Sequence, residues 1–352
     1  MTSVFTDAGR PVEPGPHVRL GARPGSAAAR HIVHVGYHKT ASTWLQRCVF
    51  PRLAGVRYGD PPLSHLLASL ASAPNEGFFA SEFGSVLRQS ERLAGEPLLL
   101  SDEGVSGSLW DGYGTGPRNA ERLSRVLPAG RILVLVRRQD HMLRSIHGQY
   151  VNEGGTRSLS DFLSGRQIEG SRLSLQHLEY DRLVRRYIEL FGRDQVRVMP
   201  YEHLRARPVR FLHELCEFLG ATPTGRVSAT RHNRSLSPPS LWLLRSWNRC
   251  FRVSRFNQDP LVRALPGGRR MRNLLQRRVD PIVRNVIGRG IPREDDATLA
   301  GIAAGFSDSN RRLQQFCAYP LTEWGYPLPS VSAPAVAGAT LLARSFVPAA
   351  TD

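Results

Sequence analysis

Short apolar runs recur along the chain and are separated by longer segments with helical spacing. The runs read HIVHVG at 31–36, PLLLSDE at 97–103, RILVLV at 131–136 and QVRVMP at 195–200. Continuous runs of this length, rich in Val, Ile and Leu, are typical of strands buried on both faces of a parallel sheet. The pattern therefore predicts at least four strands of one parallel sheet.

The segments between these runs have the periodicity of amphipathic helices. Apolar positions from Leu175 to Phe191 follow helical spacing, and Gly192 stands where a C-terminal cap is expected. We predict helices from Thr43 onward and over 117–127, 140–150, 174–191 and 209–219. Strands that alternate with helices predict a three-layer α/β/α domain with a central parallel sheet and right-handed crossovers.

The two ends of the chain lack this periodicity. Residues 1–29 and 331–352 are biased toward small residues, so we expect flexible tails around one domain over 30–330. No apolar run reaches 18 residues, and the N-terminus lacks the pattern of a secretory signal. Four widely spaced cysteines predict reduced thiols rather than disulfides or a zinc site. These features favour a cytoplasmic location.

Charge is concentrated in one part of the sequence. The chain has 352 residues and a formal net charge of +17, and residues 231–293 hold fifteen arginines against two acids. Apolar positions in this arginine-rich arm predict two short amphipathic helices meeting at Pro281. Four interpretations stay open: a solvated helical face, the wall of a polyanion-binding cleft, a peripheral membrane-surface patch, and nucleic-acid contact.

The first strand leads into a candidate phosphate-binding loop. In HIVHVGYHKTASTWLQ a strand is followed by a turn at Gly36 and a helix that begins near Ser42–Thr43. Unpaired N–H groups and the helix dipole make such a helix start an anion site. Lys39, the only lysine among 47 basic residues, stands in this loop. His38 occupies the place where an ATP or GTP P-loop requires glycine, which tells against that motif.

The loop GYHKTASTWLQ resembles the 5′-phosphosulfate loop of sulfotransferases. A second motif, LVRRQDHMLRSIHGQY at 135–150, resembles the segment with which that superfamily binds the 3′-phosphate of its donor through an arginine and a serine eight residues later. The residues that the resemblance assigns to donor binding are Gly36, Lys39, Thr40, Ala41, Ser42, Thr43, Trp44, Arg137 and Ser145. Weaker similarity to blocks of bacterial members extends over residues 31–327.

The resemblance implies a P-loop-like sulfotransferase fold and an enzyme that uses 3′-phosphoadenosine 5′-phosphosulfate (PAPS) without a metal. The sulfuryl group would pass in line to a hydroxyl or amine. Lys39 would stabilise the charge that develops on the bridging oxygen, and Glu103 would be the general base, with Asp102 and His38 as alternatives. The glycine-rich R-K-G loop of well-studied cytosolic members is not matched here, and residues 231–293 are a candidate substitute.

Two other functions remain open from the residues alone. A P-loop-type kinase would use ATP with magnesium held by Asp102 and Glu103, and a basic polyanion- or nucleic-acid-binding protein would act independently of Lys39. For a sulfotransferase we expect no nucleic-acid partner. The acceptor, whether a glycan, a lipid or a natural product, is set by variable segments such as 52–96, 104–116 and 152–173. Neither it nor the oligomeric state follows from the sequence.

Overall fold

The computed structural model describes residues 31–59, 61–72, 80–164, 168, 171, 173–225, 236–262, 275, 279–280 and 296–329. The predicted tails lie outside these residues. Most residues of the two helices predicted to meet at Pro281 also lie outside the described residues.

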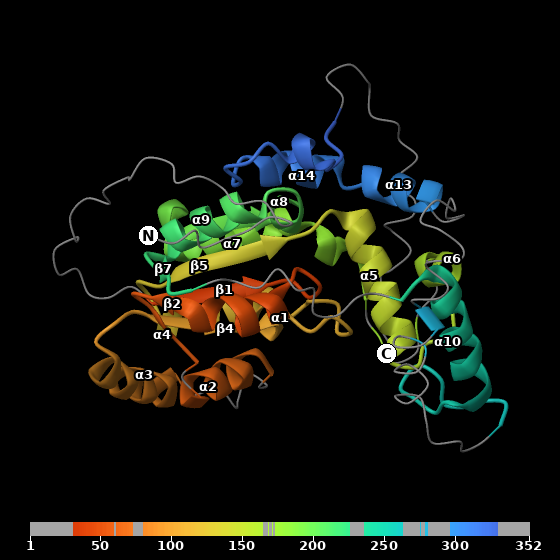
Figure 1. Ribbon diagram of the computed structural model, residues 1–352, viewed down its shortest axis with the longest axis horizontal. Helices are drawn as coiled ribbons and strands as arrows, with labels where there is room; N and C mark the ends of the chain where they lie inside the picture. The colour runs from red at the N-terminus through yellow and green to blue at the C-terminus, as the bar shows by residue number, and fades with distance from the viewer. Residues whose placement is uncertain are drawn as a thin grey trace, which may run out of the picture.

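A five-stranded parallel sheet in the order β3-β4-β1-β5-β6 forms the centre of the molecule (Figure 1). Its strands are β1 (Ile32–Gly36), β3 (Arg57–Tyr58), β4 (Leu98–Ser101), β5 (Arg131–Val136) and β6 (Val196–Pro200). The four apolar runs each supply one strand, and in β5 the five residues from Ile132 to Val136 are fully buried. This confirms the predicted α/β fold with a central parallel sheet.

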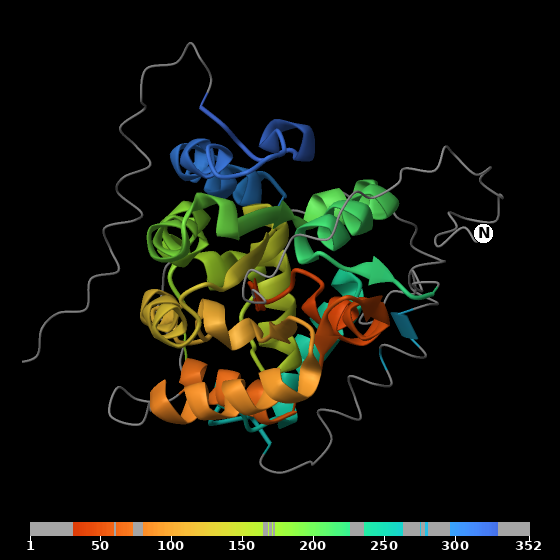
Figure 2. The ribbon, with the colours of Figure 1, turned by 90° about the vertical axis from the view of Figure 1, so that its left-hand side faces the viewer.

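Helices cover both faces of the sheet. Figure 2 shows α4 and α7 on one side and α1 and α9 on the other. The helices are α1 (Ser42–Trp44), α2 (Pro61–Ser72), α3 (Ala80–Ala94), α4 (Gly116–Val126), α5 (Gln139–Asn152), α6 (Leu159–Leu163), α7 (Tyr180–Phe191), α8 (Tyr201–Ala206), α9 (Pro208–Leu219), α10 (Pro238–Phe251), α13 (Asp296–Ala304) and α14 (Ser307–Gln314). None of the helices in the described part of the chain is long and apolar enough to cross a membrane.

Shorter elements complete these layers. A π-helical turn (Leu45–Val49) and a 3-10 turn (Phe50–Arg52) continue α1, and β2 (Leu53–Ala54) pairs antiparallel with β7 (Thr222–Pro223). Further 3-10 turns span Glu103–Ser106, Leu175–Leu178, Arg193–Gln195 and Leu321–Trp324. All four cysteines are free thiols, as predicted.

Two predictions about secondary structure were wrong. The helix expected over 174–191 is divided, because Glu179 leaves the helical region at φ −77° and ψ 76° and separates the turn Leu175–Leu178 from α7. The segment 52–96, treated as a variable loop, contains α2, α3 and the edge strand β3. Leu63, Leu67 and Leu70 of α2 are fully buried, so this segment is part of the core.

The strand order brings together the ends of distant segments. β1 lies between β4 and β5, with Val33 opposite Leu100 and Gly36 opposite Leu135. Parallel strands end at the same edge of a sheet, which is where α/β proteins place their sites. The loop after β1, the residues after β4 and the first residues after β5 therefore meet at one edge.

Candidate functional site

The loop after β1 has an unusual backbone conformation. Lys39 and Ala41 both have φ of 71°, a left-handed value that side chains rarely adopt. Ala41 is the N-cap of the helix that begins at Ser42, where the sequence predicted it. The Thr40 hydroxyl donates a hydrogen bond of 2.6 Å to the Tyr37 carbonyl oxygen. This hydrogen bond closes the loop on itself, and the assignment of Thr40 to donor binding stays a prediction.

Gly36 is required at the end of β1 by close packing. A Cβ at this position would lie 2.6 Å from Ser42 Oγ and 3.1 Å from His34 Nε2. Only glycine therefore lets the buried Ser42 side chain sit against the strand end. The His34 ring on the same strand is held by a 2.7 Å hydrogen bond between Nδ1 and Ser101 Oγ, and its Nε2 makes no hydrogen bond within the described residues.

Glu103 lies beside this loop, directly after β4. Its Oε2 atom is 3.9 Å from His38 Nε2. Burial raises the pKa of the Glu103 carboxyl, while the Ser42 hydroxyl and the Lys39 ammonium group oppose the rise. The Ser42 hydroxyl is close enough to influence this pKa without meeting the criteria of a hydrogen bond. Burial, with the charge of Lys39, also lowers the pKa of His38 to about 4, so His38 is neutral at pH 7.

The neighbouring carboxylate, Asp102, is bonded to the local backbone. Its Oδ1 accepts a 2.6 Å hydrogen bond from the Gly104 backbone N–H and caps the turn Glu103–Ser106. A residue used as an N-cap stabilises the local backbone. Of the two carboxylates, Glu103 is the one whose pKa responds to Lys39 and Ser42 of the loop.

Arg137 connects the second motif to the first. Its Nη1 donates a 3.0 Å hydrogen bond to the Lys39 carbonyl oxygen, although the two residues are 98 positions apart. The guanidinium also lies over the Tyr201 ring at 4.8 Å, and its buried Nε makes no hydrogen bond within the described part of the chain. The two sequence motifs therefore meet in space.

The remaining predicted donor residues lie farther from this contact. Ser145 is half-buried on α5, two turns along the helix from Arg137. Thr43 and Trp44 are half-buried in the first helical turn, where Trp44 packs against the hydrophobic core.

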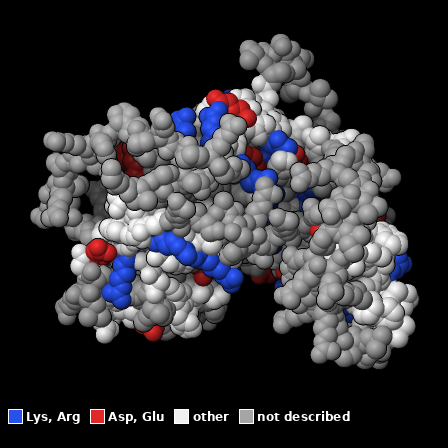
Figure 3. Space-filling view, viewed as in Figure 1, with Lys and Arg blue, Asp and Glu red and all other residues white. Residues whose placement is uncertain are grey.

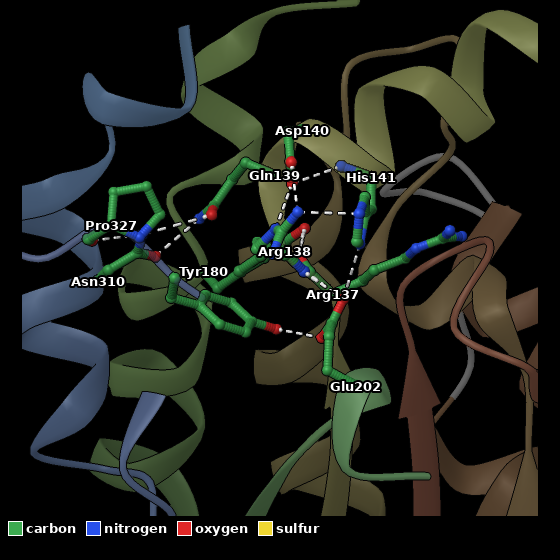
Figure 4. A network of polar contacts seen from close by, with 10 residues as sticks. Arg137, Arg138, Gln139, Asp140, His141, Tyr180, Glu202, Asn310 and Pro327 are labelled. Carbon is green, nitrogen blue, oxygen red and sulfur yellow. Dashed lines mark hydrogen bonds and ion pairs between the residues drawn. The ribbon is translucent and has the colours of Figure 1, made fainter. Parts of the chain in front are cut away.

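Arg138, the residue after Arg137, belongs to a structural network. Its Nε and Nη2 each donate a 2.7 Å hydrogen bond to the Asp140 carboxylate, and its backbone N–H donates to Glu202 Oε1 at 3.1 Å. Figure 4 shows the side chains of Arg137 and Arg138 pointing apart. At the start of α5, Gln139 Nε2 donates a 2.8 Å hydrogen bond to Asn310 Oδ1 of α14. Arg138 is therefore already paired, whereas Arg137 is directed to the loop after β1.

Tyr113 is a residue of this edge that the sequence analysis missed. Its ring packs against Tyr37 at 5.2 Å and His38 at 5.7 Å between centroids. Its φ is 54°, and a Cβ on Gly107 would lie 2.6 Å from its Cα. The phenol oxygen is buried near the His38 amide but forms no hydrogen bond that meets the geometric criteria. The glycines of DGYGTG were the available signal of a strained turn.

The described residues were also compared with the requirements of a metal site. Among the described residues no group of three or more His, Cys, Asp or Glu side chains is arranged to hold a metal ion. The site therefore consists of a strained loop, one lysine, one arginine and one half-buried carboxyl group.

Comparison with known proteins finds a similarity to sulfotransferases over part of the chain. Residues 114–224 match the Sulfotransferase family, a segment that contains Arg137 and Ser145 but not the loop after β1. This match supports the resemblance to the sulfotransferase superfamily that the second motif carries. No curated protein matches the chain in sequence.

Several solved structures are similar. A sulfotransferase from Alicyclobacillus acidocaldarius is 19% identical, with 61% of this chain and 89% of that chain covered and a TM-score of 0.43. Mouse sulfotransferase SULT7A1 complexed with PAP is 16% identical, with 83% and 89% covered and a TM-score of 0.37. The sulfotransferase domain from the curacin biosynthetic pathway is 12% identical, with 84% and 100% covered and a TM-score of 0.37.

Proposed function

We propose that this protein is a sulfotransferase that moves the sulfuryl group of PAPS to a hydroxyl, or an amine, of an acceptor. The observation that carries the proposal is the 3.0 Å hydrogen bond between Arg137 and the Lys39 carbonyl. PAPS has phosphate on both the 5′ and the 3′ side of one ribose. A protein that binds it needs two anion sites close together, and this contact joins the two motifs that would supply them.

The chemistry of the site suits such a donor. The Arg137 guanidinium is a fork of donors that matches phosphate oxygens, and its buried Nε has no partner in the described residues. Lys39 adds an ammonium group, and the helix beginning at Ser42 adds backbone N–H groups and a favourable dipole. Ser145 on α5 is our further candidate for the 3′-phosphate. PAPS would supply an activated sulfuryl group with a nucleotide as leaving group.

Lys39 is the residue we assign to the leaving group. Negative charge grows on the oxygen that bridges phosphorus and sulfur as that bond breaks, and a donor aimed at it lowers the barrier. The left-handed φ of Lys39 fixes where its side chain leaves the loop. Strained backbone of this kind is tolerated where function requires one geometry.

Glu103 is the residue we assign as the general base for the acceptor. A base must take the proton of the attacking hydroxyl, and its efficiency increases as its pKa approaches the working pH. Burial raises the pKa of Glu103 in that direction. His38 lies 3.9 Å away and is neutral at pH 7, so it is a second proton acceptor within the same cluster.

Donor binding is the direct test. We expect 3′,5′-adenosine bisphosphate to raise the thermal unfolding midpoint in the absence of magnesium, and Arg137→Ala to reduce this shift. Transfer of labelled sulfate from PAPS to a panel of glycans, lipids and hydroxylated small molecules would then identify the acceptor. Stabilisation only by ATP with magnesium would instead support a kinase, and salt-sensitive nucleic-acid binding unaffected by Lys39→Ala would support a binding protein.

A further inference from the structure

Exposed apolar side chains gather on one part of the molecule, away from the sheet edge. Six large hydrophobic residues are exposed in the described part of the chain, and five of them lie between residues 242 and 262. These five are Trp242, Leu243, Val253, Leu261 and Val262. Trp242 is 57% exposed and Leu261 is 74% exposed. Exposed apolar residues that gather in one segment mark a contact surface more often than single scattered ones.

Helix α10 presents Trp242 on its outward face and Leu243 at the side of that face. Its inward face is buried on α5, where Asn248 Nδ2 donates hydrogen bonds to the carbonyl oxygens of Val151 at 2.7 Å and Gly155 at 3.0 Å. Ser240 and Leu244 share that inward face with Asn248 at a spacing of four residues. Trp242 lies two positions from Ser240, about 200° around the helix, and so faces away from the protein.

The segment after α10 extends the same outward strip. Backbone N–H groups of Leu261 and Val262 donate to the carbonyl oxygens of Arg249, at 3.3 Å, and Cys250, at 2.8 Å. Arg249 is seven positions beyond Trp242, which is two helical turns along the same face, so Leu261 is held at the end of that face. On the right-hand side of Figure 3, where Figure 1 places α10, the described atoms are white with blue atoms at the edge.

The charge around this strip is positive. Residues 236–262 contain four arginines and one acid, Asp259. The other acid of the arginine-rich arm, Asp280, is buried and accepts a 2.6 Å hydrogen bond from the Ser237 backbone N–H. The apolar strip thus lies in the most basic part of the sequence.

From this combination we infer that the outward surface of α10 and residues 253–262, here called the α10 surface, binds the headgroup region of an anionic lipid bilayer. Trp, Leu and Val would enter the boundary between headgroups and acyl chains, and the arginines would contact lipid phosphates. Tryptophan is enriched at this depth of a membrane because its ring is largely apolar and its N–H is polar.

This inference goes beyond the proposed function and does not depend on it. Asn248 joins α10 to the C-terminal end of α5, whereas the donor residue Arg137 precedes the N-terminal end. The 14 residues of α5 span about 21 Å. Surface binding would therefore leave the donor edge open to solvent and bring the enzyme to acceptors that reside in a lipid surface.

Vesicle sedimentation of the full chain tests the inference. We expect binding to vesicles of phosphatidylcholine with phosphatidylglycerol and much weaker binding to phosphatidylcholine alone. The double variant Trp242→Ser/Leu243→Ser should reduce the partition coefficient on the order of tenfold or more. Arg249→Gln should reduce it about fivefold, and this smaller loss should disappear at high salt.

Control measurements distinguish a loss of vesicle binding at the α10 surface from unfolding and from a defect at the donor site. Val209→Ser changes the sixth exposed apolar residue, on α9, and should leave vesicle binding unchanged. The unfolding midpoint without ligand checks that each variant is folded, and the shift by 3′,5′-adenosine bisphosphate should be the same in all. The inference is overturned if the wild type ignores anionic vesicles, if the double variant binds them equally well, or if sedimentation equilibrium shows that this surface joins two copies of the chain.

Discussion

Two polar clusters meet at the carboxyl edge of the sheet, and they differ in how well their members are bonded. In the cluster around Arg138, the guanidinium is paired with Asp140, and Glu202 accepts from the Arg138 backbone and from the Tyr326 hydroxyl (Figure 4). In the cluster around Lys39, buried polar atoms of His34, His38 and Arg137 make no hydrogen bond within the described residues.

This difference in hydrogen bonding distinguishes a cluster that stabilises the fold from a cluster that forms a binding site. A buried polar atom without a partner costs about 1–3 kcal/mol, so a folded protein seldom keeps several together. The Lys39 cluster also contains the left-handed residues Lys39 and Ala41. Unpaired polar atoms and backbone strain at one place are typical of a site that a ligand completes. The Arg138 cluster needs no ligand, and its contacts to α8 and α14 hold the start of α5 in place.

The largest expected effect is at Glu103. Glu103→Gln keeps the shape of the side chain but removes the base, so kcat should fall about 10²–10⁴-fold while the thermal shift by 3′,5′-adenosine bisphosphate persists. Because Glu103 acts deprotonated and its pKa is raised, the wild-type rate should increase as pH rises through that pKa and be lost below it. A pH–rate profile of both proteins measures this. An unchanged profile in the variant would exclude Glu103 as the base.

Lys39→Ala should lower the single-turnover rate of sulfuryl transfer by ~10²–10³-fold, which corresponds to about 3–4 kcal/mol of barrier. The loss arises because the developing charge on the bridging oxygen is no longer stabilised. The change of an arginine outside both clusters, Arg182→Ala, serves as the control for lost positive charge. Near-normal turnover of the lysine variant would refute the assignment.

The two adjacent arginines should respond in opposite ways. Arg137→Ala should weaken donor binding by about 1.5–3 kcal/mol, measured by calorimetry, with little loss of stability. Arg138→Ala should instead lower the free energy of unfolding by about 1–3 kcal/mol, since it leaves the Asp140 carboxylate without its bidentate partner. If both variants lose donor affinity alike, the division into a structural and a functional cluster is wrong.

The smallest expected effect is at Tyr113. Tyr113→Phe removes a buried hydroxyl that forms no hydrogen bond by geometric criteria, so the free energy of unfolding should stay the same or rise by up to about 1 kcal/mol. Chemical denaturation measures the change. A loss of more than about 1 kcal/mol would show that the phenol is bonded in solution and belongs with the paired cluster.

Local patterns in the sequence predicted much of the scaffold. The four apolar runs became β1, β4, β5 and β6 because continuous burial on both faces selects Val, Ile and Leu at every position. The loop was recognisable because Gly36, Lys39 and the following hydroxyl residues lie within a few positions of each other. The helical division at Glu179 was missed because it depends on one backbone conformation that leaves the apolar periodicity intact.

The sequence could not distinguish the roles of neighbouring residues that have the same chemistry. Arg137 and Arg138 differ only in direction at the end of β5, and the partners that distinguish them, Lys39 and Glu202, are far away along the chain. The same holds for Asp102 and Glu103, of which one caps a turn and the other lies beside the loop. The outward position of Trp242 likewise depends on which side of α10 packs against α5.

What the sequence by itself determined is the alternation of buried strands and helices, the phosphate loop with its single lysine, and the resemblance of two motifs to sulfotransferases. All of these features depend on residues that are close together in the chain. Only the tertiary structure decided that β1 lies between β4 and β5, which brings Glu103, Lys39 and Arg137 to one edge. Strand order is set by the packing of helices and strands distant in sequence, and no local periodicity carries that information.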